Sequence, residues 1–407
     1  MSLETLIHTV GIKINTDKES TLNKLYNIEE IFRDESFSLQ KLVSRDFEID
    51  EITKVMNELV RQEFATSFYS YDCEKFDSVG NAVSLSEKCE FCGDTLNESS
   101  SSHTIKKMFK LNKLFIKLLS EQRKSELDKY IIKDYNLNLQ SLIDNSGRLI
   151  PFLGAGTSVP LGLPNWKELL LDLDRGLKET DAKQYNLLIN RGQFFRALKF
   201  LNQYSGVFKD KRVIKKEIAR VINTRYKRNM NDKFHNINDI LNLNSDFYIT
   251  TNYDNAFTDY RNNFVMPLNL NEIEDIQDLI SENKQRVIHL HGNIEKQSSM
   301  IVDEDDYNNL YSERKINDIL TAILGNRRLL FIGFSFNDQY FKDLYSNIIK
   351  NINGEHFIIV PNLHTFDADE YYEMNLIPIG VNVEEENGKL STTDYVKAIK
   401  AVLCQLL

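Results

Sequence analysis

Cysteine is scarce in this chain, with four residues among 407. These are Cys73, Cys89, Cys92 and Cys404, and their number and spacing do not fit the disulfide framework of a small secreted protein. The sequence also lacks an N-terminal basic segment followed by an apolar one, so it predicts no secretory signal. These absences predict a protein of a reducing compartment, and we expect the bacterial cytoplasm.

Long apolar runs and an excess of positive charge are missing as well. No apolar stretch reaches the roughly 20 residues that a helix needs to span a bilayer, so we expect no membrane segment. The formal net charge is −10, which does not favour a nucleic-acid-binding protein as a whole. What is present is a globular composition, with 42% hydrophobic and 27% charged residues, over a length that suits two domains.

The pattern along the chain changes near residue 145, where Asp-Asn-Ser-Gly at 144–147 indicates a turn. We predict an N-terminal module over 1–105, a basic helical linker over 106–147 and an α/β domain over 148–407. Five short apolar runs predict the strands of a parallel sheet: Arg148–Leu153, Asp246–Thr251, Arg286–Leu290, Leu329–Gly333 and His356–Val360. The long helical pattern between the first two runs predicts an inserted helical subdomain.

The N-terminal module shows apolar residues at helical spacing in three short segments, 22–31, 38–43 and 51–60. An alternating, aromatic segment at 63–71 follows and is typical of a hairpin strand. This order resembles a winged helix-turn-helix. Such a module serves as a helical adaptor, as a dimerisation module or as a DNA-binding element, and the sequence leaves these three roles open.

A candidate metal site follows this strand. Cys89 and Cys92 flank Glu90-Phe91 and precede Gly93, which is the spacing of a zinc knuckle. Cys73 offers a third ligand, and the fourth is His103 or an aspartate such as Asp72. The alternative is a small core that contains three reduced cysteines.

Residues 106–133 carry nine lysines and arginines against three acidic residues, interleaved with apolar side chains. This pattern predicts an amphipathic basic helix. Such a helix contacts nucleic acid or an acidic partner surface, or it is a linker with one solvated face.

The most informative motif is Gly154-Ala155-Gly156-Thr157-Ser158, directly after the first predicted strand. Without Cβ atoms, the backbone N–H groups of such a turn can approach a phosphate closely. Val159 stands where the dehydrogenase fingerprint requires its third glycine, so the motif does not indicate a dehydrogenase.

Three later motifs also follow predicted strands: Thr250-Thr251-Asn252-Tyr253-Asp254, His289-Leu290-His291-Gly292 and Gly333-Phe334-Ser335. An asparagine can orient a water molecule because its amide both donates and accepts hydrogen bonds. A histidine is suited to act as a general base near neutral pH. Two alternatives stay open: the asparagine motif is only a strand-end Asx turn, or His289 is the base instead, since alternation along the strand places it on the face of His291.

Together these four ordered motifs resemble the sirtuin fold, specifically the SIR2-like domains of bacterial immune effectors, over about residues 148–400. The resemblance implies a Rossmann-like parallel sheet that binds NAD+. It also implies cofactor-binding roles for seven residues. They are Gly154, Ala155, Gly156 and Ser158 at the pyrophosphate, Trp166 as the covering aromatic, and Gly333 and Ser335 near the adenosine side.

The resemblance assigns the reaction to three residues. Asn252 would face the nicotinamide ribose and the nucleophile, Asp254 the carboxamide, and His291 would be the base. The chain departs from the family where Thr251 replaces a glutamine and Lys167 replaces an arginine.

Sirtuins that deacylate proteins carry a four-cysteine zinc module after the His-Gly motif, and this chain has no cysteine between residues 93 and 403. The resemblance therefore implies that water attacks the ribose and that NAD+ is hydrolysed to nicotinamide and ADP-ribose. It further implies a regulated effector that depletes NAD+ in anti-phage defence, a homo-oligomer, and a partner subunit from the same operon that senses infection. The alternative is a non-catalytic NAD+ or ADP-ribose sensor that acts through a partner or DNA.

Overall fold

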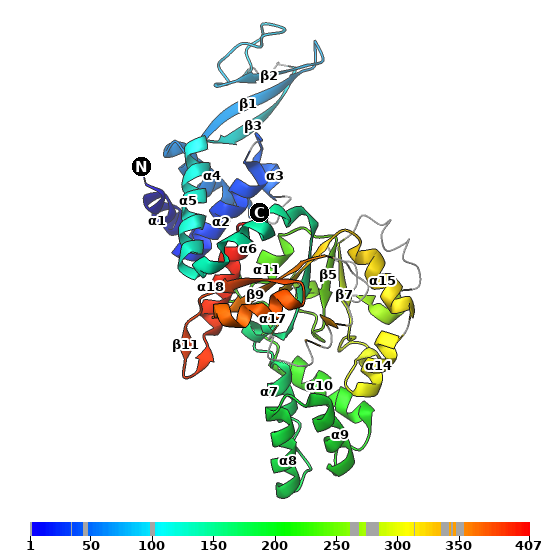
Figure 1. Ribbon diagram of the computed structural model, residues 1–407. Coiled ribbons are helices and arrows are strands. Elements are labelled where there is room, and N and C mark those ends of the chain that lie inside the picture. Colours follow the sequence, from blue (N-terminus) through cyan, green and yellow to red (C-terminus); the bar gives the residue numbers. More distant parts are fainter. Residues whose placement is uncertain are drawn as a thin grey trace. The chain divides into compact units, whose positions relative to one another are not determined.

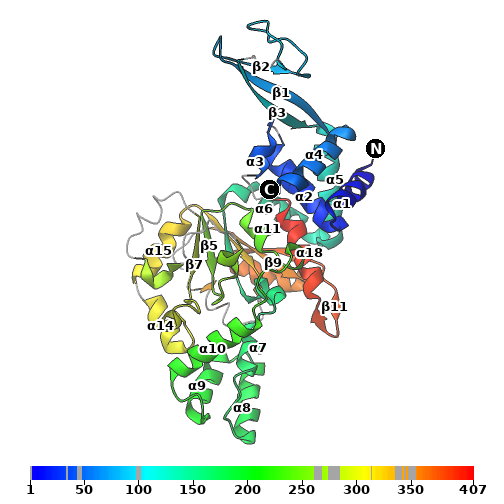
Figure 2. The same cartoon turned by 180° about the vertical axis from the view of Figure 1, so that it is seen from behind.

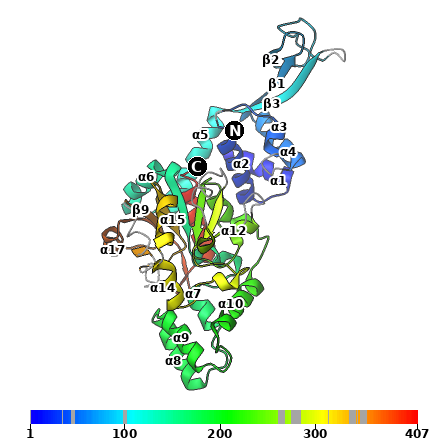
Figure 3. The ribbon, with the colours of Figure 1, turned by 90° about the vertical axis from the view of Figure 1, so that its right-hand side faces the viewer.

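The structure is a computed structural model that describes residues 2–33, 35–43, 48–97, 102–260, 268–273, 285–312, 314–334, 342, 345–346 and 354–407. Figures 1, 2 and 3 show its elements from three sides. The chain forms two compact units, Met1–Glu126 and Leu127–Leu407. Among the described residues, no helix combines the length and the apolar character that crossing a bilayer requires.

The first unit packs helices against a three-stranded antiparallel sheet of order β2-β1-β3 (Figure 1). The side chains of Ser2 and Asp17 cap the first two helices by accepting hydrogen bonds from backbone N–H groups. Its elements are α1 (Leu3–Ile14), α2 (Lys18–Phe32), α3 (Leu39–Val43), α4 (Ile49–Arg61), β1 (Ala65–Cys73), β2 (Ser78–Ala82) and β3 (His103–Leu111). Helix α5 (Lys113–Tyr130) continues from this unit into the second.

These elements confirm the three predicted helical segments and the predicted strand near 63–71. The helix predicted over 106–133 is wrong in its first part, because 103–111 form β3 and the helix begins at Lys113. Along β3, Phe109 and Leu111 are buried whereas Lys106 and Lys110 are exposed. Antiparallel pairing with β1 imposes this two-residue period over the helical one. The winged-helix resemblance of the module stays a prediction.

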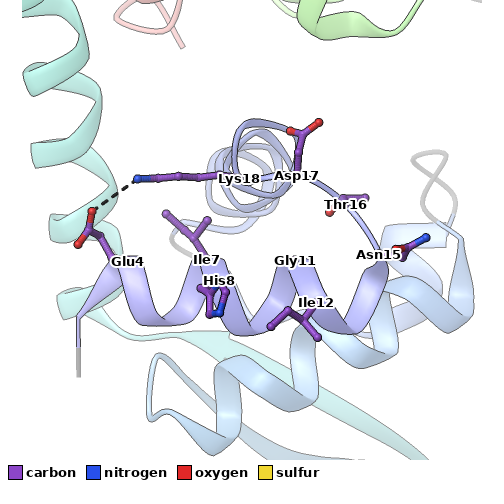
Figure 4. A pocket seen from close by; sticks show the side chains of 9 residues that line it. All are labelled: Glu4, Ile7, His8, Gly11, Ile12, Asn15, Thr16, Asp17 and Lys18. Carbon is purple, nitrogen blue, oxygen red and sulfur yellow. Dashed lines mark ion pairs between the residues drawn. The ribbon is translucent and has the colours of Figure 1, made fainter.

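A hollow on the first unit lies along α1 and the turn into α2 (Figure 4). Glu4 and Lys18 form an ion pair of 3.5 Å beside it. None of the residues that line this hollow belongs to the predicted site motifs.

The second unit contains a seven-stranded sheet of order β10-β9-β8-β4-β5-β7-β6, in which all pairs are parallel. Its strands are β4 (Leu149–Leu153), β5 (Phe247–Thr250), β6 (Leu268–Asn269), β7 (Arg286–His289), β8 (Arg328–Ile332), β9 (His356–Pro361) and β10 (Leu376–Val381). All five predicted strands are present, and the predicted Rossmann-like α/β fold is confirmed. The sequence missed the two outermost strands, β6 and β10.

Helices cover both faces of this sheet, which explains why its strands are apolar without alternation. All five residues of β4 are buried. Ile150 and Phe152 face one core together with α15 (Arg314–Leu324). Leu149 and Leu153 face the other core, which contains residues of α6 (Asn136–Asp144), α11 (Ile237–Leu241), α12 (Ala256–Asp259) and α18 (Thr392–Leu403).

Between β4 and β5 the chain forms the predicted helical insert, which has a core of its own. Its helices are α7 (Trp166–Leu171), α8 (Glu179–Asn190), α9 (Phe194–Tyr204) and α10 (Lys211–Arg225). Asn165 and Glu168 form a reciprocal capping box that begins α7. Figure 2 shows α8 and α9 lying away from the sheet.

The remaining elements complete the two units. In the second unit they include α14 (Glu304–Ser312), α17 (Ala368–Glu373) and the small hairpin of β11 (Glu385–Glu386) and β12 (Lys389–Leu390). Of these, α14 contributes to the site described next.

Candidate functional site

The register of the central strands brings the predicted motifs to one edge of the sheet. Leu153, the last residue of β4, pairs with Thr250 of β5 and with Ile332 of β8. Thr250 in turn pairs with His289 of β7. Because the strands are parallel, the segments that follow these residues all leave from the carboxyl edge. The chain order reverses around β4, and ligands of open α/β sheets bind at such a point.

The two glycine turns that follow β4 and β8 contact each other through their backbones. Gly156 N donates to Gly333 O over 2.9 Å, and Gly154 N donates to Ile332 O over 2.9 Å. A Cβ atom on Gly154 would lie 2.6 Å from Gly333 O, and one on Gly156 would lie 2.8 Å from Gly333 Cα. Gly333 itself has φ +77°. All three glycines are therefore required for this close approach.

The contact restricts which amides of the turn are free to bind a ligand. The N–H groups of Gly154, Gly156, Thr157 and Ser158 all donate to backbone carbonyls. Ala155 begins a short 3-10 helix, Ala155–Thr157, and within the described residues its N–H makes no such bond. Among the described residues, the Ala155 N–H is therefore the backbone donor that the turn leaves for a phosphate.

Asn252 lies directly against the first glycine turn. Its Nδ2 donates to Gly154 O and to Ser158 Oγ, each over 3.0 Å. Its own N–H donates to Thr250 Oγ1 over 3.0 Å. The side-chain hydrogen bonds that Asn252 makes with other described residues all use Nδ2, which leaves Oδ1 as the acceptor toward a ligand.

Asp254 is buried on the same loop. Its carboxylate accepts from Ala256 N over 3.0 Å and is also hydrogen-bonded to the Ser158 side chain. Burial raises the pKa of this carboxyl above its usual value. The bond to Ala256 is the Asx turn that the sequence offered as an alternative, so Asp254 has a structural role, and its predicted contact with a carboxamide stays a prediction.

His291 is 2% exposed and contacts two tyrosines of α14. Its Nε2 lies 3.0 Å from Tyr311 Oη, and its ring is 6.1 Å from each of the Tyr307 and Tyr311 rings. Burial lowers the pKa of His291 to about 3, so the imidazole is neutral at neutral pH. No sequence motif indicates Tyr311, although its position four residues after Tyr307 is the spacing of neighbours on one helix face.

His289 has a different partner from His291. Its Nδ1 lies 2.9 Å from the backbone oxygen of Asn252. Strand β7 ends at His289, and the two following residues form a turn. The alternation that predicted a common face for the two histidines therefore does not extend to His291.

The acidic segment after His-Gly fixes α14 to the helical insert. Lys211 pairs with Asp303 over 2.6 Å and with Asp306 over 2.9 Å, and Lys215 pairs with Asp306 over 3.0 Å. Asp303 also accepts from Asp306 N over 2.8 Å, as expected for a helix start. Asp303 and Asp306 therefore have a structural role, because they begin α14 and hold it against α10.

Trp166, the single tryptophan of the chain, is the first residue of α7. Its ring lies 5.8 Å from that of Tyr253, the residue after Asn252. Trp166 therefore lies beside the predicted catalytic loop, as a covering aromatic would. Ser335, the last predicted cofactor-binding residue, lies outside the described residues.

In the first unit, the structure brings the four predicted zinc ligands together. The ligand atoms of Cys73, Cys89, Cys92 and His103 all lie within 4.8 Å of one another. Cys73 and His103 are cross-strand partners on β1 and β3. Cys89 and Cys92 lie on a turn closed by a 2.9 Å bond from Gly93 N to Cys89 O. Three thiols and one imidazole are the donor set of a structural zinc site, and no partner among the described residues satisfies the buried His103 Nδ1.

Replacing Gly156 with alanine is expected to lower the free energy of unfolding by about 1–3 kcal/mol, because the new Cβ would force the two turns apart. Urea denaturation measures this difference. Gly147→Ala is the matched control, since its Cβ would meet nothing within 4 Å. Equal stability of the two variants would contradict the interlocked turns.

The buried histidines should make stability depend on pH. Burial lowers the pKa of His289 to about 4 and that of His291 to about 3, from an ordinary value of 6.5. Below pH 6.5 the unfolded chain binds protons that the folded chain does not, so stability is greatest above pH 6.5 and falls as the pH decreases toward 4. We expect a loss of about 2 kcal/mol per histidine between pH 7 and pH 5. Urea titrations at both pH values measure it, and equal stabilities would contradict it.

The sheet order and the turns at its carboxyl edge define a Rossmann-like α/β domain. Residues 246–379 match the family model of the SIR2-like domain. This match includes the Asn252 and His291 motifs and the second glycine turn, and the first turn precedes it.

Three curated proteins named NAD(+) hydrolase ThsA are similar to this chain. The protein of Cytobacillus dafuensis is 26% identical over 240 residues, which cover 57% of this chain and 44% of that protein. The protein of Enterococcus faecium is 25% identical over 288 residues, covering 62% and 55%. The protein of Acinetobacter baumannii is 25% identical over 244 residues, covering 56% and 45%. The matches thus span about half the length of these relatives.

Proposed function

We propose that this protein is an NAD+ glycohydrolase that cleaves NAD+ to nicotinamide and ADP-ribose. The observation that carries the proposal is the contact of Asn252 with the glycine turn at Gly154 and Ser158, at the edge where His291 also lies. The similarity to proteins named NAD(+) hydrolase supports it.

Hydrolysis of NAD+ requires a correctly positioned water molecule and a base that takes up its proton, whereas the leaving group needs no acid. Nicotinamide leaves from a cationic pyridinium, so no proton has to be supplied to it. Asn252 Oδ1 would accept a hydrogen bond from the attacking water or from the ribose, while the neutral imidazole of His291 would take up the proton. The Ala155 N–H would hold a pyrophosphate oxygen, and Trp166 would cover the bound dinucleotide.

The test is direct. The purified full chain is incubated with NAD+, and nicotinamide and ADP-ribose are quantified by chromatography. We expect both products in equal amounts. Intact NAD+ together with tight binding of ADP-ribose would favour the second candidate, a non-catalytic sensor. The deep burial of His291 against Tyr311 is the observation that favours this candidate.

We further propose that the enzyme is a regulated effector that depletes NAD+ in anti-phage defence. Uncontrolled NAD+ loss would kill the host, so its activity must depend on a signal. Residues 1–126 would provide this control in the cytoplasm. They would do so by binding a partner subunit encoded in the same operon, by contacting nucleic acid, or by assembling the chain into a homo-oligomer. Expression with the neighbouring genes should cause NAD+ to fall on infection, and constant NAD+ would contradict the role.

We also propose that Cys73, Cys89, Cys92 and His103 bind a structural zinc ion. We expect about one zinc per chain by metal analysis, as four such ligands form a closed tetrahedral site. Cys89→Ser should lose most of the zinc and lower the melting temperature. Cys404→Ser is the control, since Cys404 lies outside the cluster. Equal zinc content in both variants would contradict the site.

A further inference from the structure

His289 is the last residue of β7 and is 1% exposed. Its Nδ1 lies 2.9 Å from the backbone oxygen of Asn252. A carbonyl oxygen only accepts hydrogen bonds, so Nδ1 carries the hydrogen and Nε2 carries a lone pair. Within the described residues this buried Nε2 has no hydrogen-bond partner.

Burying a hydrogen-bond acceptor without a partner costs free energy, so the imidazole is less favourable at this position than an apolar side chain of similar size. Val287, two positions earlier on β7 and therefore on the same face of the strand, is buried and apolar. An apolar side chain at position 289 would pack in such surroundings without leaving a polar atom unpaired. The contribution that distinguishes the histidine is therefore its hydrogen bond to Asn252.

That hydrogen bond completes the support of the Asn252 backbone. Thr250 Oγ1 accepts from the N–H of Asn252, and His289 donates to its carbonyl. With both backbone groups held, the side chain points at Gly154 O and Ser158 Oγ. Gly156 continues the connection to Gly333, so hydrogen bonds link the ends of β7, β5, β4 and β8.

We propose that His289 is a positioning residue for NAD+ hydrolysis, which holds the carbonyl of Asn252 through Nδ1–H and thereby orients the Asn252 amide toward the reacting ribose. This inference rests on the proposed function and deepens it. In this arrangement the single hydrogen of the neutral His289 ring lies on Nδ1, from which it is donated to the Asn252 carbonyl. Burial, which lowers its pKa to about 4, keeps it neutral.

Two substitutions separate the two ring nitrogens. In His289→Asn the amide nitrogen takes the place of Nδ1 and keeps the donor to Asn252. In His289→Gln the amide lies near the position of Nε2 and the donor is lost. His289→Leu removes both nitrogens while the side chain stays buried and apolar.

The experiment compares these variants with the unmodified full chain. We expect kcat to fall about 10- to 100-fold in His289→Leu and His289→Gln, with KM for NAD+ changed less than about 3-fold, because a small displacement of a catalytic group acts on the chemical step. His289→Asn should retain at least about 10 times the kcat of His289→Leu. Melting temperatures are measured for all four proteins. If His289 had a purely structural role, kcat would correlate with the melting temperature and would not depend on whether the variant keeps the donor to Asn252.

Two further readouts separate this inference from the proposed function. Trp166 fluorescence reports binding of NAD+ or ADP-ribose without turnover, since the chain has one tryptophan. Nitrogen NMR of the ligand-free protein reports which ring nitrogen of His289 is protonated. Equal kcat in the three variants, or a proton on Nε2, overturns the positioning role while the enzyme remains an NAD+ hydrolase. A chain that neither binds nor consumes NAD+ overturns both.

Discussion

His291→Ala is expected to reduce NAD+ hydrolysis by at least about 100-fold, the usual contribution of a general base. The neutral imidazole is the group that would take up the proton as water adds to the ribose, and alanine cannot replace it. Initial rates of nicotinamide release, with NAD+ well above KM, measure the effect. Binding of ADP-ribose should persist, because the glycine turns are unchanged.

The variant also removes a buried ring and leaves the Tyr311 hydroxyl without this partner. A control must therefore lose a similar buried imidazole elsewhere. His356→Ala is suitable, since His356 is fully buried at the start of β9 and accepts from Leu329 N over 3.1 Å. We expect both variants to be destabilised and only His291→Ala to lose turnover. Retained turnover in folded His291→Ala would exclude His291 as the base.

Asn252→Asp is the second change with a large expected effect. The carboxylate has nearly the same shape, but it replaces Nδ2 with an oxygen that faces the carbonyl of Gly154. We expect turnover to fall by at least about 100-fold, since both the turn and the nucleophile would be misplaced. We also expect the free energy of unfolding to fall by about 1–3 kcal/mol, since a buried acceptor loses its donor. Chromatography and urea denaturation measure the two effects.

Asn293→Asp is the matched control for this change. Asn293 is 3% exposed, and its Oδ1 accepts from the backbone N–H groups of Glu295 and Lys296. An aspartate accepts both bonds equally well, so activity and stability should change little. Equal losses in Asn252→Asp and Asn293→Asp would show that a new buried charge, rather than the lost donor, causes the effect.

The sequence predicted most of the large sheet because its strands are buried on both faces. Leu149–Leu153 and Leu329–Ile332 are continuous apolar runs that end in glycine turns, and such runs are typical of parallel strands. The parallel arrangement then places all strand-end motifs at one edge of the sheet. The proximity of Asn252 to the glycine turn was therefore predictable from the order of strands and motifs along the chain. Strand β6 has two residues and carries no such signal.

Other features depend on contacts that the sequence does not encode locally. The spacing of the lysines in β3 is also compatible with a basic helix. Only the pairing of β3 with β1 shows that Phe109 and Leu111 lie on one face of a strand. The closeness of Gly156 to Gly333 appears once β4 and β8 are neighbours. This contact uses amides that the motif alone would offer to a phosphate.

The hydrogen-bond partners of His289 and His291 could not be predicted from the sequence either. Alternation along β7 predicted a common face, but the turn after His289 separates them, and their partners come from different elements. Tyr311 lies 20 positions after His291, and no spacing rule joins a strand end to a later helix. The cluster at Cys73 and His103, in contrast, was predictable from residue type, and the antiparallel register explains how the two meet.

The most direct test of the account is the structure of the His291→Ala protein with NAD+ bound. We expect the pyrophosphate at the Ala155 amide, the nicotinamide ribose within hydrogen-bond distance of Asn252 Oδ1, and the vacated position of the imidazole on the same side as the attacking water. A dinucleotide bound elsewhere, or one whose nicotinamide ribose contacts neither Asn252 nor the space beside Tyr311, would contradict it.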